Sequence, residues 1–598
     1  MSNFVYRGLQ RRLVIAFDLG TTFSGVSYSI LDPGETPEIK GVTRFPAHEQ
    51  VNSGSKIPTV IYYDQNAKVQ AVGAEAMQKE KVDQAKKEGW SKVEWFKLHI
   101  RPKNSSGKED ESIAKIPPLP DSGLLSVVDI TSDFFQYLFE CTRTYIEESH
   151  ANGTDVWASV ENEIDFVISH PNGWGGYQQS QLREALEHAG LVSPHEADRV
   201  SFITEGEASL HFALRNGLPE ATMEKGEGII IVDGGGGTID VSAYRKPKFS
   251  DTFEEIAPSE CHFLGSVFVS MHAREFLDNR LKESDYHDEL DHIVSCFDKT
   301  TKVWFSDDKK TQYVRFGSTR DNDADFDIRF GQLKLEGSDV ASFFEPSVNC
   351  IVEAVKDICK DSPYPISHVV LVGGFSASEW LYKKLESAVQ SLSLEILRPQ
   401  SHPNKAVSDG AVSSYLNGIV TARIARFSYG VLRNIEYIPD DPQHAKRSES
   451  VLYRPSGRKM VPDAFEVMLA KGTKVSDETE VSIKMWKEVT DETKSKLEAV
   501  PFTLYCYRGG KKSGRAKPPR FYDEDSVGFT KLCSVQADLS KLPLEPIPKG
   551  NGVEGTFYRV KYSVVLLFNS AELKAHIRWE ENNTEQRTPA SVIFFDDS

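Results

Sequence analysis

Residues 229–244 read Ile-Ile-Ile-Val-Asp-Gly-Gly-Gly-Gly-Thr-Ile-Asp-Val-Ser-Ala-Tyr, a pattern of strand, glycine turn and strand that is the most informative about the fold. The apolar residues at its start are typical of a buried strand, and the alternation over residues 239–244 is typical of a strand returning beside it. Four successive glycines are costly in backbone entropy, so they predict a close backbone–ligand contact, with a positive φ angle at Gly236. The glycines of a dinucleotide-binding turn open a helix instead, which excludes that alternative. We therefore expect a β-hairpin whose turn, residues 233–238, binds phosphate.

A similar strand–turn–strand pattern lies near the N-terminus, at residues 13–31. A buried strand ends at Asp18, and a second strand returns after a turn that reads Gly-Thr-Thr-Phe-Ser-Gly. Gly20 would let a phosphate approach the backbone, and Thr21 and Thr22 would add hydroxyl donors. Asp18 could hold magnesium through water molecules, because Mg²⁺ keeps much of its hydration shell. Taken alone, the pattern also fits an ordinary β-hairpin.

The two hairpins form a weak internal repeat, which predicts two similar lobes that face each other. A third motif, Val-Val-Leu-Val-Gly-Gly-Phe-Ser at residues 369–376, places Gly373 and Gly374 after another buried strand. Such a turn could pack against a flat base and its ribose. In this order, the three motifs predict one nucleotide held between two lobes.

The bulk composition bounds the class of protein. A chain of 598 residues is too long for one hydrophobic core, so two or three domains are expected. The net charge of −18 argues against nucleic acid or an anionic membrane as a partner. Seven cysteines without a Cys-x-x-Cys pair argue against a disulfide framework or a zinc site. Because we find neither a secretory signal nor an apolar run that could span a membrane, we expect a cytoplasmic protein, with the nucleus as the alternative.

The remaining periodicity predicts helices and a change of character near Arg423. Helices are expected over residues 83–95, 128–148, 178–189 and 340–359, and a further strand over residues 165–169. After Arg423 strict alternation takes over, for example at residues 558–568. We therefore expect a smaller β-rich domain at residues 424–598.

The three motifs resemble those of the seventy-kilodalton heat-shock chaperones, in the same order. Residues 15–29 resemble the first phosphate loop, residues 229–244 the second, and residues 368–381 the adenosine motif. The resemblance spans about residues 11–423, and the divergent branch called heat-shock protein twelve looks most similar, because it shares the Trp-Phe-Lys stretch at residues 95–97. It implies an α/β, two-lobed actin-like ATPase (ribonuclease H-like) fold. The domain would cover residues 1–423, with lobes at about 11–225 and 226–423.

The resemblance also implies roles for individual residues. Phosphate binding would fall to Gly20, Thr21, Thr22, Gly235, Gly236, Gly237 and Thr238. The magnesium waters would be held by Asp18 and Asp233. The γ-phosphate would be reached by Lys97, for which the alternative is a surface lysine with a buried stem. The attacking water would be positioned or polarised by Glu205 and Asp240. The adenosine would be bordered by Gly373 and Gly374.

This sequence also departs from the family pattern. Ala377 and Ser378 stand where the family has an arginine against the adenine, and Lys302 stands where a second arginine is usual. The acidic, leucine-rich interdomain linker is missing near residues 420–435, and the C-terminal part is too short and β-rich for a peptide clamp with a helical lid. These departures place base specificity and interdomain coupling in doubt.

Three functions follow from these patterns. The first is a slow, Mg-dependent, chaperone-like ATPase whose nucleotide state is read by a C-terminal domain that binds a protein client. The second is a catalytically weak nucleotide-binding scaffold. The third, a small-molecule kinase of the same fold, is less expected because no second substrate motif is present. Phosphoryl transfer to water depends mainly on positioning and charge neutralisation, which the residues above could supply.

Overall fold

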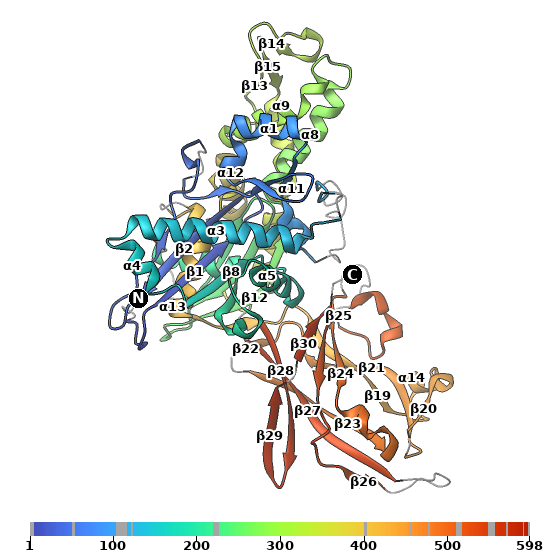
Figure 1. The fold of residues 1–598 in the computed structure, drawn as a ribbon. Coiled ribbons are helices and arrows are strands. Elements are labelled where there is room, and N and C mark those ends of the chain that lie inside the picture. Colours follow the sequence, from blue (N-terminus) through green and yellow to red (C-terminus); the bar gives the residue numbers. More distant parts are fainter. Residues whose placement is uncertain are drawn as a thin grey trace. The chain divides into compact units, whose positions relative to one another are not determined.

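The computed structural model describes residues 5–50, 54–102, 116–120, 123–218, 226–399, 403–454, 456–476, 479–509, 517–547, 556–569, 572–589 and 591–595. The chain divides into two compact units (Figure 1). The first comprises Met1–Arg101, Ser105–Trp174 and Gln181–Thr421, and the second comprises Pro102–Asn104, Gly175–Ser180 and Ala422–Ser598. Each unit is described below by itself.

The N-terminal hairpin of the first unit belongs to a mixed sheet. The strand order is β3 (Lys40–Gly41), β2 (Phe23–Leu31), β1 (Arg12–Asp18), β8 (Ile164–His170) and β9 (Val200–Thr204), and β4 (Ile57–Pro58) also pairs with β2. β1 and β2 are antiparallel, whereas β8 and β9 continue the sheet in parallel. The apolar run Leu13 to Phe17 is fully buried, as expected for a strand covered on both faces.

The second hairpin belongs to a sheet of the same topology. The part of its order that matches the first sheet is β12 (Phe253–His262), β11 (Ile239–Arg245), β10 (Gly228–Gly234), β16 (Ile366–Val372) and β17 (Glu395–Leu397). Again an antiparallel hairpin, β10–β11, is extended by two parallel strands. Both predicted hairpins are therefore confirmed, and the repeat extends to the neighbouring strands.

Helices connect and cover these sheets. They are α1 (Lys79–Glu88), α3 (Val127–Ser149), α4 (Gly153–Ala158), α5 (Gly176–His188), α6 (Glu205–Arg215), α8 (Ser266–Leu281), α9 (Leu290–Lys299), α10 (Thr301–Trp304), α11 (Gly337–Asp361), α12 (Glu379–Gln390) and α13 (Ala406–Asn417). α13 contacts β1 and β2, α6 contacts β10 and β11, and the two helices pack together. They approach so closely that a Cβ on Gly410 would lie 1.8 Å from the carbonyl oxygen of Ala208. This helix pair joins the two sheets.

One helical prediction needs correction. The segment 83–95 was expected to be helical, but α1 ends at Gly89, whose φ of 70° reverses the chain. The next residues form β7 (Ser91–Glu94), which with β6 (Val69–Val72) flanks β5 (Val60–Tyr63). The helices predicted at 128–148, 178–189 and 340–359 are confirmed as α3, α5 and α11. A further small sheet has the order β13 (Gln312–Arg315), β15 (Gln332–Leu335) and β14 (Ile328–Arg329).

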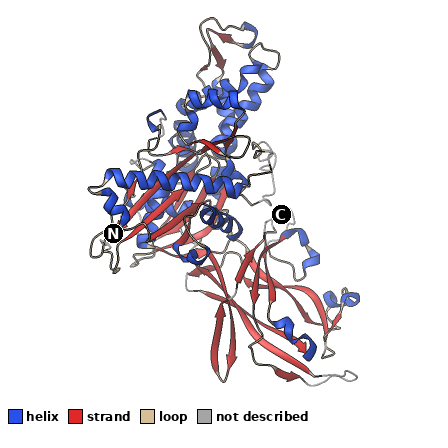
Figure 2. Ribbon diagram, viewed as in Figure 1, coloured by secondary structure: helices blue, strands red, loops and turns tan. Residues whose placement is uncertain are grey.

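The second unit consists mainly of strands (Figure 2). One sheet has the order β20 (Leu452–Tyr453), β21 (Lys459–Leu469), β19 (Ser428–Glu436), β24 (Val500–Tyr507), β25 (Phe529–Ala537) and β30 (Ser591–Phe594). The other has the order β23 (Glu480–Thr490), β27 (Phe557–Asn569), β28 (Glu572–Glu581) and β29 (Thr584–Pro589), with β26 (Glu545–Ile547) also paired to β27. The chain enters this unit through β18 (Val420–Ile424), which pairs with β22 (Lys474–Ser476), and α14 (Pro442–Ala445) is its short helix.

Both sheets of the second unit contribute to one hydrophobic core. Val431 and Leu504 come from the first sheet, and Val560, Val564 and Ile577 come from the second. The alternation predicted from the sequence places these side chains on the inner faces, as in a sheet with one covered side. In the parts of the chain that the structure describes, no helix is long and apolar enough to cross a membrane.

Candidate functional site

The turns of the two hairpins face each other in the first unit. A Cβ placed on Gly236 would lie 2.3 Å from Thr22 Oγ1, and a Cβ on Gly237 would lie 2.3 Å from Thr21 Oγ1. The positive φ angle expected at Gly236 is wrong, because its backbone is not left-handed. The opposing threonines supply a different reason for the missing side chains: the two turns meet here, and no Cβ would fit.

Each turn is held by hydrogen bonds of its own. The Gly20 N–H donates to Ser24 Oγ at 3.1 Å, and a Cβ on Gly20 would lie 2.0 Å from the Phe23 carbonyl oxygen. In the second turn, the Gly235 N–H donates to the Thr238 carbonyl oxygen at 2.9 Å. Both turns therefore keep their shape through local contacts.

Four carboxylates predicted from the sequence are buried around these turns. Asp18 ends β1, Asp233 lies one residue before the end of β10, and Asp240 faces Asp233 across the β10–β11 hairpin. Glu205 is the first residue of α6, where the positive end of the helix dipole favours a carboxylate. All four side chains belong to residues that are at most 7% exposed.

Two lysines are paired with members of this cluster. Lys97 Nζ lies 2.5 Å from Glu205 Oε1 and 5.6 Å from the centre of the Trp174 ring, while Lys56 Nζ lies 2.6 Å from Asp18 Oδ2. Because Lys97 is 3% exposed, the alternative of a surface lysine is excluded. Four carboxylates thus face two ammonium groups.

The excess of negative charge is visible in the pKa values. Burial, and then the nearby Glu205 carboxylate, raise the pKa of Asp233 to about 7 and that of Asp240 to about 8. Burial also raises the pKa of Glu205, although Lys97 opposes this. Burial alone would lower the pKa of Lys97, but the nearby carboxylates, Glu205 above all and then Asp18 and Asp240, together hold that pKa above its ordinary value. A further cation near the carboxylates would relieve the repulsion between them.

Three residues of this cluster were not predicted from the sequence. Ser209 Oγ donates to Asp233 Oδ2 at 2.6 Å, and the Asn172 backbone N–H donates to Asp240 Oδ1 at 2.6 Å. Lys56 is the third. Asn172 follows the end of a parallel strand, which is a usual place for a site residue. Ser209 and Lys56 carry no comparable signal, because one lies within a helix and the other precedes a two-residue strand.

The third glycine motif lies beside the same carboxylates. Gly373 has a φ of 86°, and a Cβ there would lie 2.2 Å from Asp233 Oδ1. Glycine is therefore required twice at this position, for its backbone conformation and for space. A Cβ on Gly374 would meet only Asn404 Oδ1, at 3.6 Å, so this second glycine is less constrained.

Lys302 lies on α10, near the start of α8. It forms an ion pair with Asp298, and its Nζ donates to Ser270 Oγ at 3.1 Å and to the Ser266 carbonyl oxygen at 3.4 Å. The Ser266 N–H in turn donates to the Gly235 carbonyl oxygen at 3.1 Å, which links this region to the second glycine turn. No group of three or more His, Cys, Asp or Glu side chains is placed to ligate a metal directly in the described parts of the chain.

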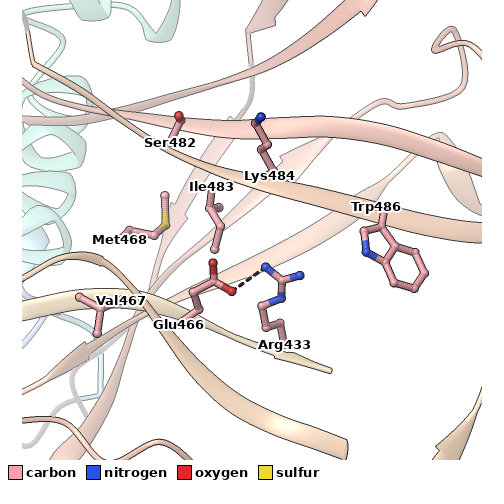
Figure 3. Close-up of a pocket in the computed structure, with 8 residues that line it drawn as sticks. All are labelled: Arg433, Glu466, Val467, Met468, Ser482, Ile483, Lys484 and Trp486. Atoms are coloured by element: carbon pink, nitrogen blue, oxygen red, sulfur yellow. Dashed lines mark hydrogen bonds and ion pairs between the residues drawn. The ribbon is translucent and has the colours of Figure 1, made fainter. Parts of the chain in front are cut away.

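The second unit has a groove of about 430 Å³ between β21 and β23 (Figure 3). Arg433 and Glu466 form an ion pair at 2.6 Å on one wall. Ile483 points from β23 toward that pair (Figure 3). Among the described strands, β23 pairs on one side only, with β27, so its other edge borders the groove.

Two arginines flank the end of the groove at Trp486, and one of them, Arg559, is paired with the buried carboxylate of Glu488 at 3.1 Å. The Trp486 ring lies 5.3 Å from the guanidinium of Arg454 and 4.9 Å from that of Arg559. Burial lowers the pKa of Lys487, and the charges of Lys496 and Arg454 add to this effect. An anionic group would be favoured here.

Comparison with known proteins supports the resemblance stated above. No family model matches the chain. The chain is 21% identical over 499 residues to heat shock 70 kDa protein 12A of Mus musculus, which covers 70% of this chain and 72% of that protein. It is 19% identical over 665 residues to heat shock 70 kDa protein 12B of Homo sapiens, which covers 97% of this chain and 91% of that protein. The predicted similarity to the heat-shock protein twelve branch is confirmed, at low identity over most of the chain.

Proposed function

We propose that this chain, a distant relative of heat shock 70 kDa proteins 12A and 12B, binds ATP with magnesium in its first unit and hydrolyses it slowly. One observation carries the proposal: two glycine turns meet next to four buried carboxylates that are opposed by two lysines. The turns would hold the phosphates, and the carboxylates would hold the cation that accompanies them. The matching topology of the two sheets supports the two-lobed actin-like arrangement.

The donor set fits magnesium. Mg²⁺ prefers oxygen ligands and keeps several of its waters, which suits Asp18 and Asp233 as partners of water rather than as direct ligands. Asp18 ends β1 and Asp233 lies near the end of β10, at equivalent places in the two sheets. When bound, magnesium would neutralise phosphate charge and polarise the phosphoryl oxygens.

The chain's own residues would do the remaining work. Lys97 would stay charged and hold the terminal phosphate, because the Glu205 carboxylate favours its protonated form. Glu205 would orient the attacking water, and Asp240, held by the Asn172 N–H, would support it from the second turn. Gly373 and Gly374 would border the adenosine, with Lys302 near the base.

Calorimetric titration with ATP, ADP and GTP, with and without magnesium, is the first test, followed by phosphate release. We expect Mg-dependent ATP binding, and we expect Glu205→Gln to bind ATP while releasing phosphate about 100-fold more slowly, the usual effect of losing a group that positions the proton transfer. Lys92→Met, in an exposed ion pair with Glu94, is the control and should match the unmodified protein. Absence of ATP binding would refute the proposal.

The titration and the phosphate-release assay together separate the alternative functions. Binding of ATP without phosphate release beyond the background would favour the scaffold. Phosphate transfer to an added sugar would favour the kinase.

The second unit is the candidate for the domain whose partner binding responds to the bound nucleotide. We propose that the groove between β21 and β23 binds an extended, acidic segment of a partner protein by adding a strand to the open edge of β23. The charge beside Trp486 selects the acidic partner. Trp486→Ala should weaken binding of an acidic extended peptide, whereas Tyr453→Ala, an exposed aromatic on β20, should not. Equal binding by both variants would contradict this assignment.

A further inference from the structure

Lys56 reaches the carboxylate cluster from the segment just before β4. It immediately precedes β4, whose two residues pair with Phe23 and Ser24 of β2, so Lys56 comes to lie beside Gly25. Gly25 is the register partner of Asp18 in the β1–β2 hairpin. A Cβ on Gly25 would lie 3.2 Å from Lys56 Cγ and 3.5 Å from Lys56 Cε, so the lysine stem runs along the surface of this glycine.

The end of the side chain forms an ion pair with one carboxylate of the cluster, and its charge also acts on Glu205 and Asp233. Lys56 Nζ lies 2.6 Å from Asp18 Oδ2, and the side chains are 17% and 4% exposed, respectively. The second lysine of the cluster, Lys97, is paired with Glu205. Lys56 is therefore the cation that forms an ion pair with the carboxylate of the first hairpin. Removing one partner of such a largely buried pair leaves the other charge poorly compensated.

We propose that Lys56 is an internal counter-ion that competes with magnesium for Asp18, and so sets how much magnesium the site needs. This inference rests on the proposed function, in which Asp18 holds magnesium waters. An ammonium group and a hydrated Mg²⁺ both neutralise this carboxylate, and two cations held beside it repel each other, so each weakens the binding of the other. Binding of the metal and its nucleotide would therefore displace Lys56 from Asp18, and its flexible stem along Gly25 lets it turn to a phosphate oxygen.

The simpler alternative is an ion pair that only supports the fold. In that case magnesium and Lys56 would act independently, and removal of the lysine would change stability by the same amount with and without magnesium. The two possibilities differ in the coupling between Lys56 and magnesium, which can be measured without nucleotide or turnover.

The test is thermal unfolding of the full chain without nucleotide, in chelator and in millimolar magnesium chloride. Lys56→Met should unfold at a lower temperature than the unmodified protein in chelator, and magnesium should raise its midpoint clearly more than it raises that of the unmodified protein. Lys56→Arg, which keeps the charge, should restore the unmodified behaviour. Lys92→Met again serves as the surface control. Equal magnesium shifts in Lys56→Met and the unmodified protein would overturn the inference.

A second measurement uses ATP. The magnesium concentration for half-maximal ATP binding should be about tenfold lower in Lys56→Met, because a competing buried cation is gone. Gly25→Ala, which crowds the stem and keeps the lysine, should lower it by a smaller factor, and it replaces Lys56→Met if that variant does not fold. One outcome is that no form binds ATP, but magnesium still raises the unfolding midpoint of Lys56→Met more than that of the unmodified protein. The proposal of nucleotide binding would then be refuted, and the competition between Lys56 and magnesium would be supported. If ATP binds with the same magnesium requirement in all forms, the competition alone is refuted.

Discussion

The two hairpin turns of the first unit occupy equivalent places in two sheets of the same topology, yet they contribute differently. The first turn carries side chains, with Thr21 and Thr22 at its tip, whereas the second carries bare glycines. Where they meet, Thr22 stands against Gly236 and Thr21 against Gly237. One turn supplies hydroxyl groups and the other supplies the space for them.

The carboxylates behind the turns differ in the same way. Asp18 is compensated by a lysine, whereas Asp233 receives a hydroxyl hydrogen bond from Ser209 and has a pKa raised to about 7. The two sheets therefore share a topology, but the carboxylates at equivalent strand ends have different electrostatic environments. The charge balance depends on which side chain happens to reach each strand end.

The largest expected effect comes from filling the space of the second turn. Gly236→Val should abolish ATP binding and leave the second unit folded, because its Cβ would already collide with Thr22 Oγ1. Thr22→Ala should weaken binding by only about tenfold or less, the value of one hydroxyl hydrogen bond. Isothermal titration gives the affinities, and circular dichroism reports folding.

A compensating pair of substitutions tests the contact between the two turns directly. Gly236→Ala should bind poorly alone and recover when it is combined with Thr22→Gly, which moves the free space to the other turn. Strong ATP binding by Gly236→Val would mean that the turns are not the phosphate site.

The next largest effect should come from the cation. Asp18 and Asp233 beside three phosphates form a repulsive arrangement without a metal, so ATP affinity should drop sharply in chelator. Asp233→Asn should remove much of this magnesium dependence, and Asp278→Asn, at an exposed ion pair with His287, should leave it intact. Equal ATP affinity with and without magnesium would contradict the shared-metal assignment.

A smaller effect on stability and on ATP affinity is expected from pH, and it arises from two carboxylates of the second hairpin. Asp233 and Asp240 have pKa values raised to about 7 and about 8, so the folded protein without nucleotide binds protons that the unfolded chain has lost. Its stability should therefore fall as pH rises from near 4 to about 8. Magnesium favours the ionised carboxylates, so in its presence ATP affinity should rise over pH 6–8 with release of protons.

Calorimetry in buffers of different ionisation enthalpy counts these protons. Asp240→Asn should release fewer of them than the unmodified protein. Affinity that falls with rising pH over this interval would contradict the assigned pKa directions.

The smallest effect should be the coupling between nucleotide and the second unit. No leucine-rich linker is present near residues 420–435, so we expect coupling at or below the low end of the roughly 1–3 kcal/mol seen in allosteric proteins. Hydrogen exchange over the described residues from 424 onward, with ATP, ADP and no nucleotide, measures it. Strong protection of β23 and β27 by ATP alone would instead indicate a full chaperone cycle.

The local elements of this protein could be predicted from its amino-acid sequence. Apolar runs and alternation are read from neighbouring residues, so β1, β2, β10, β11 and, in the second unit, β27 could be predicted. The glycine turns and the carboxylates at the strand ends were found for the same reason. The helix expected over residues 83–95 was wrong after Gly89, because pairing of β7 with β5 is a contact between distant segments.

How these elements combine depends on long-range contacts, which are visible in the folded structure and not in the sequence. Contacts between residues far apart in the chain place Lys56 on Asp18, Ser209 on Asp233 and Thr22 against Gly236. None of these pairs has a periodicity or a spacing that a sequence could display. They depend on strand register and helix packing, and the raised pKa values follow from the burial that this packing produces.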